Sequence, residues 1–537
     1  MSKKIKNSVY SSGTGYGEAG ASYRKKSLKA LKAHSTSPNE DINYNLATLR
    51  RRSRTLYMGA PIATAAMKTM RTNVVGLGLI PSSKIDYEFL GISQKSAEKT
   101  QKEINRWFDL WANDKRSCDA TGMNDFYDLE GIGLMSAIMN GDGFALIKRK
   151  KATPERPLTL RIDLKEADLV STPSGNTSYS SIVTDGINTK NNNKIYDGVE
   201  VDKDGMIVAY HVCNQYPYET KYSSVAQWTR IEVEGKLTGT PNILHICNVE
   251  RAGQLRGVPF IAQIIEPLLQ MGRYTESELM AALVNSFFTA FITTEKETNI
   301  LQGEDVDISN ENDTDIAIGT GTINQLNPGE SVTFGDPKHP NSGFDIFMIT
   351  LCKLVSAALE LPHEIVLKCF NSNYSASRAA IMEAWKVFLA YRRWFKSDFC
   401  TPIWKMIIDE LVATGKISAP GYFDNILVRE AYCGATWTGP TQGQLDPMKE
   451  VQAEKLKVEE GFSTREESTR NLTGGDYSIN ARQLKTENKL LKEANSYLPE
   501  KASVTTQLSE EKKQNNEDNN DNNGNNENDD NGKEQDG

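Results

Sequence analysis

The residues best suited to metal chemistry form two short pairs, His211-x-Cys213 and His245-x-Cys247. Each pair lies in a stretch rich in β-forming residues, and side chains two residues apart in a strand lie on the same face. Two adjacent strands could therefore offer two histidines and two cysteines to Zn²⁺, which commonly takes four such ligands. Small cysteines and hydrogen-bonded histidines are also common in buried strands that bind no metal. We favour this second interpretation and predict neither a metal site nor a cofactor.

The sequence carries none of the short motifs with which enzymes bind nucleotides or activate a serine nucleophile. The pattern G-x-x-x-x-G-K-[ST], whose backbone amides cradle phosphates, does not occur, and G-x-S-x-G is also missing. His363 and Glu364 begin an H-E pair, but the second histidine of the zinc motif H-E-x-x-H does not follow. We therefore expect no catalytic residues and predict that the chain is not an enzyme.

The stretch LPHEIVLKCFNSNYSAS, residues 361–377, has side chains that could contact phosphate groups. Lys368 is its only formal cation, Asn371 and Asn373 add amides, and Arg378 follows directly. These four residues are our candidates for contacting phosphate groups, because cations and amides are usual partners of phosphate oxygens. The alternative stays open on residue chemistry alone: an ordinary connection between two helices, with Lys368 pointing into solvent.

An amphipathic helix is predicted before this stretch. Apolar residues recur at three- and four-residue spacing from Phe344 to Leu359, which places them along one face that must be buried. Pro362 disfavours a helical conformation at Leu361, so the helix is expected to end near Glu360.

A second helix is predicted to follow, with Ser375 or Ser377 as its N-cap. Because Pro402 cannot donate a backbone hydrogen bond, we expect this helix to kink or restart there. The residues expected to point inward are Ile381, Trp385, Phe388 and Leu389.

A cluster of arginines, at positions 50, 51, 52 and 54, lies in an earlier predicted helix. Three interpretations stay open: a solvated helix face, a contact with an acidic partner, or a contact with phosphate. Further along, residues 158–247 change to short β-rich runs separated by polar turns, and a second β-rich region lies between residues 291 and 340. Helical patterns flank both regions. The predicted fold class is therefore α+β.

Charge is distributed unevenly over the 537 residues, which carry a net charge of −8. Residues 1–36 hold eight lysines and arginines against one acid, whereas residues 510–537 hold ten acids against three lysines. Both ends are too polar to form a core and are expected to be disordered. The remaining body is acidic, which disfavours general nucleic-acid binding. Seven scattered cysteines indicate reduced thiols, and no apolar run is long enough to suggest a membrane span.

Several stretches of the chain resemble the lambda-type bacteriophage portal proteins. The most specific is LELPHEIVLKCFNSNYSASRAAIMEAWKVF, which is similar to the family's LPYE, NYSSARAA and E.WR elements. His363 replaces a usual aromatic residue, and the order Ala376-Ser377 is reversed. The early LRRRSRTL, the later RAGQLRGVPF and NPGESV, and the closing WTGP are also similar, so the resemblance spans residues 15–476.

The resemblance implies an architecture as well as a fold. It assigns residues 37–257 to a wing domain, 258–290 and 341–360 to two stem helices, 291–340 to a β-rich clip, and 361–377 to a tunnel loop. It also places residues 378–476 in a kinked helix and wing or crown region. Beyond the resemblance, we expect a crown helix at 477–500. Residues 1–36 are then a basic N-terminal segment and 501–537 an acidic tail.

The resemblance further implies a function. Portal proteins form a ring, expected here to contain twelve copies, at one vertex of the capsid, and double-stranded DNA passes through its channel during packaging and ejection. The implied partners are the terminase large subunit, the major capsid protein or scaffold, and head-completion adaptor proteins. The implied location is the virion, after assembly in the host cytoplasm. The alternative function is a DNA-binding or DNA-processing virion protein without a ring channel.

Overall fold

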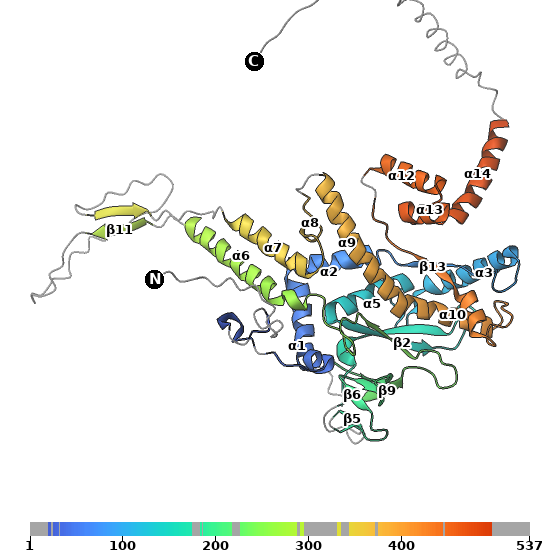
Figure 1. Ribbon diagram of the computed structural model, residues 1–537, viewed down its shortest axis with the longest axis horizontal. Coiled ribbons are helices and arrows are strands. Elements are labelled where there is room, and N and C mark those ends of the chain that lie inside the picture. The colour runs from blue at the N-terminus through green and yellow to red at the C-terminus, as the bar shows by residue number, and fades with distance from the viewer. Residues whose placement is uncertain are drawn as a thin grey trace, which may run out of the picture. The chain divides into compact units, whose positions relative to one another are not determined.

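The computed structural model describes the backbone of eleven segments: residues 20–22, 25–31, 33–173, 183–184, 186–216, 226–286, 290–294, 330–334, 343–370, 374–443 and 446–496. The chain divides into two compact units, Met1–Leu445 and Asp446–Gly537. The first unit mixes helices with several antiparallel sheets, which confirms the α+β class (Figure 1).

The first two helices, α1 (Pro38–Gly59) and α2 (Pro61–Val74), follow each other with only Ala60 between them. The side chain of Ser37 accepts a hydrogen bond from Glu40 N, and Glu40 bonds back to Ser37 N, which completes a capping box. Pro61 begins α2, where its missing N–H costs nothing. The buried side of α2 is made by Ala63, Ala66, Met67, Met70 and Val74.

A three-stranded antiparallel sheet has the order β10 (Ile243–Cys247), β2 (Asp142–Arg149) and β3 (Leu160–Glu166). Helix α5 (Phe126–Asn140) packs on it and runs directly into β2 through Gly141 (Figure 1). Gly141 has a φ of 93°, and a Cβ atom there would lie 2.3 Å from the carbonyl oxygen of Gly257. Two glycine backbones therefore touch at this turn, which leaves no room for a Cβ atom.

A second, six-stranded sheet is antiparallel throughout and follows chain order from β4 to β9. Its small core, made with residues of β2 and β10, contains Phe144, Leu146, Val170, Val199, Val201, Tyr210, Val212 and Ile243. The six strands are β4 (Val183–Thr184), β5 (Ile187–Asn188), β6 (Lys194–Tyr196), β7 (Val199–Val201), β8 (Ile207–Cys213) and β9 (Trp228–Glu232).

The larger core is dense in aromatic side chains. Phe108 of α3 (Gln94–Ala112) lies 5.4 Å from Phe126, and Phe126 stacks on Phe399 at 6.0 Å between ring centroids. Such rings bury about 150–250 Å² each, so they dominate the apolar contribution to stability. The remaining elements around this core are α4 (Lys115–Cys118), α11 (Ile426–Cys433), and the paired strands β1 (Ile80–Ser83) and β13 (Ala435–Thr438).

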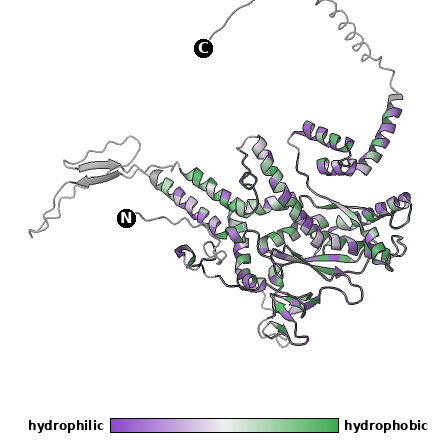
Figure 2. Ribbon diagram, viewed as in Figure 1, coloured by the Kyte–Doolittle hydropathy of each residue, from purple (hydrophilic) through white to green (hydrophobic). Residues whose placement is uncertain are grey.

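Two helices, α6 (Ile265–Ser286) and α7 (Phe344–Ala358), pack against each other in the first unit. The ring of Tyr274 on α6 stacks on Phe344 of α7 at 5.6 Å and meets Phe347 edge-on at 4.9 Å. Between the two helices in sequence, β11 (Ala290–Thr294) and β12 (Glu330–Phe334) pair as antiparallel strands. Figure 2 shows that hydrophobic residues extend along much of α7.

After the short helix α8 (His363–Leu367), the chain forms one long helical run. It consists of α9 (Tyr374–Phe395), a π-helical turn at Lys396–Cys400, and α10 (Thr401–Ala413). Pro402 lies in the first turn of α10, so the predicted restart of the helix is confirmed.

Two predictions for α9 are wrong. The helix already begins at Tyr374, so Ser375 and Ser377 lie inside it and neither is its N-cap. Leu389 is 45% exposed, because the buried side of α9 is set by Ala384, Phe388 and Phe395 instead.

The second unit contains α12 (Pro447–Glu459), α13 (Arg465–Thr473) and α14 (Tyr477–Ser496), the last where a helix is predicted from residue 477. Gly474 ends α13 in the left-handed conformation, with a φ of 70°. No helix that the structure describes is both long and apolar enough to cross a membrane. The seven cysteines are all free thiols, six of them buried, as the scattered spacing predicts.

Candidate functional site

The segment between α7 and α9 contains two tight turns, each made by a residue other than glycine with a positive φ. At the first turn, Glu360 has a φ of 55°, its N–H bonds to Ala357 O at 3.2 Å, and the N–H of Leu361 bonds to Ser356 O at 3.1 Å. This pair of bonds is the Schellman arrangement that closes helix ends, usually with glycine at the left-handed position. The predicted end of α7 near Glu360 is thus confirmed.

The second turn is made by Lys368, whose φ of 54° ends α8. Its N–H bonds to the carbonyl of Glu364, and the N–H of Cys369 bonds to the same carbonyl at 3.0 Å. The backbone conformation of Lys368 is therefore fixed by α8, while its side chain is exposed.

Three apolar side chains anchor the segment to the body. Leu359, Leu361 and Val366 are each 2% exposed, and α8 packs on α2. The residues that follow, from Lys368 to Phe370, are exposed. The segment is therefore anchored by buried residues, while residues 368–370 stay accessible to a partner, as a contact loop requires.

The four predicted site residues fall into two groups. Lys368 and Arg378 are both exposed, the first at the end of α8 and the second in the second turn of α9, and they flank residues 371–373. Asn371 and Asn373 lie outside the described residues. The described part of the segment therefore supplies two cations, and their assignment to a DNA channel stays a prediction.

The arginine cluster of α1 divides between interior and surface. Arg50 is 2% exposed and donates from Nη2 to Asp142 Oδ1 at 3.2 Å. Arg54 forms ion pairs with Glu166, at 3.3 Å, and with Asp168. Arg51 and Arg52, in contrast, are exposed. The partners of the two inner arginines are acids of the same chain, an arrangement that none of the three interpretations from the sequence included.

Asp142, at the start of β2, is the centre of this internal charge cluster. Arg256 donates from Nε to its Oδ2 atom at 2.6 Å, and the Nε2 atom of His245 lies 3.4 Å from the same oxygen. Burial would raise the pKa of Asp142, but Arg256 and Arg50 hold it well below the ordinary value. The carboxylate therefore stays charged and ties α1, β2 and the loop before α6 together.

The sequence analysis did not identify Asp142 or Arg256 as important residues. Arg256 lies in the stretch RAGQLRGVPF, which carries part of the family resemblance. A buried acid and a buried arginine are hard to pair from the sequence alone when they lie 114 positions apart.

The two histidine–cysteine pairs are not on adjacent strands. His211 and Cys213 lie on β8 of the six-stranded sheet, whereas His245 and Cys247 lie on β10 of the three-stranded sheet. His211 Nε2 contacts Glu200 at 3.0 Å. The two pairs therefore lack the adjacent strands that a shared zinc ion would require.

A different set, Asp142, His245 and Cys247, brings its donor atoms within 4.8 Å of one another. Two arginine guanidinium groups already bind Asp142, and a cation placed there would be repelled by both. Burial also raises the pKa of the Cys247 thiol, which keeps it protonated. Asp142 and His245 are joined at 3.4 Å within the charge cluster, and the neutral Cys247 thiol lies beside them.

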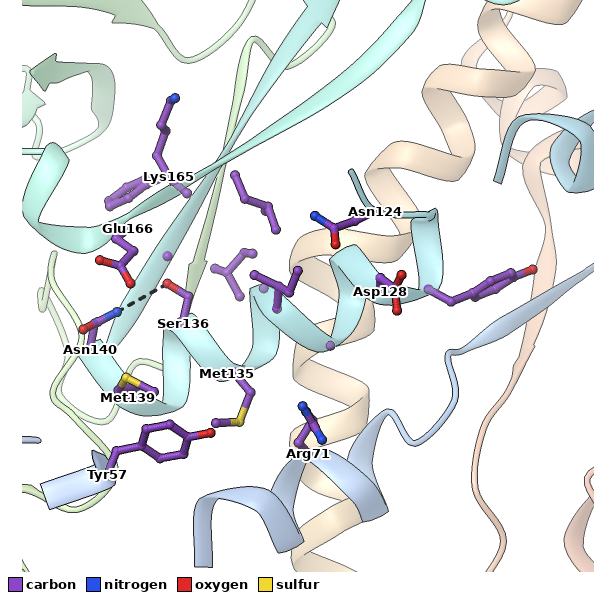
Figure 3. Close-up of a pocket in the computed structure, with 18 of the residues that line it drawn as sticks. Tyr57, Arg71, Asn124, Asp128, Met135, Ser136, Met139, Asn140, Lys165 and Glu166 are labelled. Carbon is purple, nitrogen blue, oxygen red and sulfur yellow. Dashed lines mark hydrogen bonds between the residues drawn. The ribbon is translucent and has the colours of Figure 1, made fainter. Parts of the chain in front are cut away.

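A hollow of about 650 Å³ lies along α5, and Figure 3 shows some of the side chains that line it. The side chain of Asn140 bonds to Ser136 Oγ at 3.5 Å, and Met135 and Met139 contribute apolar surface. Among the described lining residues, Ser136 has no histidine or carboxylate as a hydrogen-bonded base, so the hollow offers no nucleophilic pair of the usual kind.

Comparison with known proteins places the chain in a family. The family described as "Phage portal protein, lambda family" matches residues 24–392. Portal protein B of Escherichia phage lambda is 21% identical over 436 residues, which cover 77% of this chain and 78% of the relative. The portal protein of Escherichia phage N15 is 21% identical over 440 residues, covering 77% and 79%.

Among solved structures, a chain from the virion of a native gene transfer agent particle aligns with a TM-score of 0.42 and 13% identity. The alignment covers 79% of this chain and 92% of that one. A chain from the neck of a native gene transfer agent particle, computed with C12 symmetry, aligns with a TM-score of 0.40 and 14% identity. The match over residues 24–392 covers well over half of the sequence, and the chain therefore belongs to the lambda family of phage portal proteins, the connectors between head and tail in the virion.

Proposed function

We propose that copies of this chain close into a ring of twelve around a central channel, and that the genome passes through this channel during packaging and ejection. The family match over residues 24–392 is the observation that carries the proposal. The segment at residues 361–377 is assigned to the channel lining, with Lys368 and Arg378 as its DNA-facing cations.

Exposed apolar side chains on α6 and α7 support the ring. Within the part of the chain that the structure describes, each of them is 44–71% exposed. A second copy of the chain would cover them and gain roughly 25 cal/mol for each Å² buried. The residues are Leu279, Met280, Leu283, Ile346, Phe347, Ile349 and Leu354.

The order of elements supports an assignment of parts. Helices α6 and α7 are proposed as the stem, the strand pair β11–β12 as the clip, and the α/β region that contains the two larger sheets as the wing. Residues 378–476 then continue through the kinked helix into the wing or crown region, and α14 is proposed as a crown helix. The charged N-terminal and C-terminal segments remain outside these parts.

The proposed action is mechanical and electrostatic. The family is a structural one, and we propose that the chain works without catalysis of its own. Its proposed partners are the terminase large subunit during packaging, the major capsid protein or scaffold during assembly in the host cytoplasm, and head-completion adaptor proteins afterwards. Double-stranded DNA would pass the channel without being bound tightly, since the body carries net negative charge.

Mass measurement of the purified full chain tests the ring directly. We expect a particle near twelve times 59.7 kDa by native mass spectrometry, with a central hole in electron micrographs. A chain that stays monomeric under all assembly conditions would contradict the ring and favour the alternative, a DNA-binding virion protein without a channel. Measuring duplex DNA binding by such a monomer would then test that alternative.

A further inference from the structure

A basic hollow of about 390 Å³ lies where the loop between β2 and β3 meets the turn after α4. The hollow is far in sequence from the segment between α7 and α9, and nothing above assigns it a role. Five cationic side chains and one acid line it, and an excess of this kind attracts anions. The six charged residues are Arg116, Asp119, Lys150, Lys151, Arg156 and Arg161.

The single acid, Asp119, is directed at its own loop. Its carboxylate accepts hydrogen bonds from the backbone N–H groups of Thr121 at 2.9 Å, Met123 at 3.0 Å and Asn124 at 3.1 Å. Burial alone would raise the pKa of Asp119, but these bonds and one from the Thr121 hydroxyl lower it overall. The negative charge therefore stabilises the turn and is little available to the cations around it.

Two of the five cations are held by other groups. Arg156 Nε donates to Asp114 Oδ2 at 3.1 Å, and Lys150 Nζ donates to the carbonyl of Ala120 at 3.0 Å. Arg116 and Lys151 are exposed at the rim. The rim therefore presents two accessible positive charges, and the other cations that line the hollow, Lys150, Arg156 and Arg161, add to the positive charge beneath them.

Arg161 is the most informative residue, because it lines the hollow and yet is only 2% exposed. Its Nη1 donates to the carbonyls of Leu158 at 2.9 Å and Leu160 at 2.7 Å, which fixes the guanidinium plane. Its Nε is buried and has no hydrogen-bond partner among the described residues. A buried donor without an acceptor is destabilising, so such a group calls for an explanation.

Glu410, an acid close enough to act electrostatically on Arg161, is engaged elsewhere. Glu410 of α10 accepts hydrogen bonds from Arg149 at 2.6 Å and from the N–H groups of Thr159 and Leu160. Glu410 thus anchors the start of β3 and leaves the Nε of Arg161 unmatched.

We propose that this hollow is a binding site for a phosphate group, with Arg161 as a fixed positive charge in its wall and Arg116 and Lys151 as the mobile cations that close over it. A tetrahedral oxyanion supplies several acceptor oxygens to a guanidinium and to two flexible cations at once. The phosphate group comes from one of two sources, a phosphodiester of nucleic acid or a free phosphate ion.

The test uses the full chain, with inorganic phosphate as the probe and titration calorimetry at constant ionic strength as the measurement. We expect saturable binding that is weakened about tenfold or more in the double variant R116Q/K151Q, which removes two rim charges without touching the core. The matched control, K95Q/K99Q on α3, removes two exposed charges elsewhere and should bind phosphate like the unaltered chain. The variant R161K, checked for folding by circular dichroism, should also bind more weakly, because a lysine cannot hold a planar guanidinium charge in the wall of the hollow.

A labelled short DNA duplex distinguishes the two sources. If phosphate displaces the duplex, and the duplex binds more weakly to R116Q/K151Q, the ligand of the hollow is a phosphodiester of nucleic acid. A duplex that binds all variants equally, while phosphate binding still depends on the rim, would identify the free ion. Absence of saturable phosphate binding, or equal binding by R116Q/K151Q and K95Q/K99Q, would overturn the proposal.

Discussion

Arg256 donates from its Nε to Asp142 Oδ2 at 2.6 Å, and neither side chain is exposed to solvent. The same guanidinium donates to the backbone carbonyls of Ala167 and Val170, each at 2.9 Å. One arginine therefore links the loop before α6 to the start of β2 and to the end of β3. Because this loop leads into α6, the orientation of a proposed stem helix depends on a salt bridge inside the body.

Replacing Arg256 with methionine should be strongly destabilising. The change leaves Asp142 buried with less compensating charge, which typically costs about 3–5 kcal/mol. We expect a clearly lower midpoint in urea or thermal unfolding. The control is R251M, which removes an exposed arginine five positions earlier whose ion pair with Asp41 is open to water. Equal midpoints for the two variants would show that the buried pair contributes no more than the exposed one.

The buried Glu130 should make the free energy of unfolding depend on pH. Its side chain is fully buried, accepts from Leu79 N at 2.6 Å and from the Cys400 thiol at 3.3 Å, and burial raises its pKa to about 8. Because this value lies above the ordinary 4.5, the unfolded chain ionises first. The contribution of protonated Glu130 to the free energy of unfolding is complete below pH 4.5 and is lost as the pH rises to about 8.

The variant E130Q should remove that dependence, since glutamine keeps an acceptor for Leu79 and does not titrate. We expect E130Q to gain stability relative to the unaltered chain between pH 5 and pH 8, by roughly 3–5 kcal/mol at the upper end. Asp128 is exposed on the same helix, so D128N should leave the profile unchanged. Parallel profiles for E130Q and the unaltered chain would show that Glu130 does not titrate in this range.

Leu354, which is 61% exposed on α7, tests the assembly. Substitution with aspartate should leave the secondary structure of the subunit intact and reduce ring formation, because a charge buried between copies without a partner is costly. Size-exclusion chromatography with light scattering measures the outcome. L427D changes a leucine of similar exposure, 59%, on α11 and should still form rings. Normal ring yield with L354D would place this side of α7 outside the interface.

Lys368 tests the channel. Replacing it with glutamate should leave rings intact but reduce the length of packaged DNA or its retention, because twelve negative side chains would then face the phosphates. The loss should be larger at low salt, where repulsion is least screened. K95E, an exposed change of the same charge on α3, is the control. Full-length packaging and retention with K368E would remove this residue from the channel assignment.

Local chemistry predicts much of the fold, and long-range pairing limits the rest. Pro362 and Gly141 act within a few residues, so the end of α7 and the turn into β2 follow from the sequence. The predicted N-cap of α9 is wrong. Serines favour N-cap positions, but here residues 374–376 already belong to the helix.

Long-range pairing also limits what the sequence predicts about the candidate functional site. His211 and His245 are two residues from a cysteine in similar strands, yet β10 pairs with β2 rather than with β8. That pairing joins residues about a hundred positions apart, which no local pattern encodes. Arg50 was equally ambiguous, because its partner Asp142 lies 92 residues further along the chain.

The π-helical turn at Lys396–Cys400 sets the rotational phase between α9 and α10. Each residue of an α-helix turns the chain by about 100°, so one residue fewer in this turn would rotate the whole of α9 about its axis by that angle relative to α10. Phe399 and Cys400 are buried, which fixes the α10 side of the joint. The rotation would therefore change the direction in which Arg378, at the other end of α9, faces. The number of residues in this one π-helical turn thus sets the orientation of the proposed channel lining some twenty residues away.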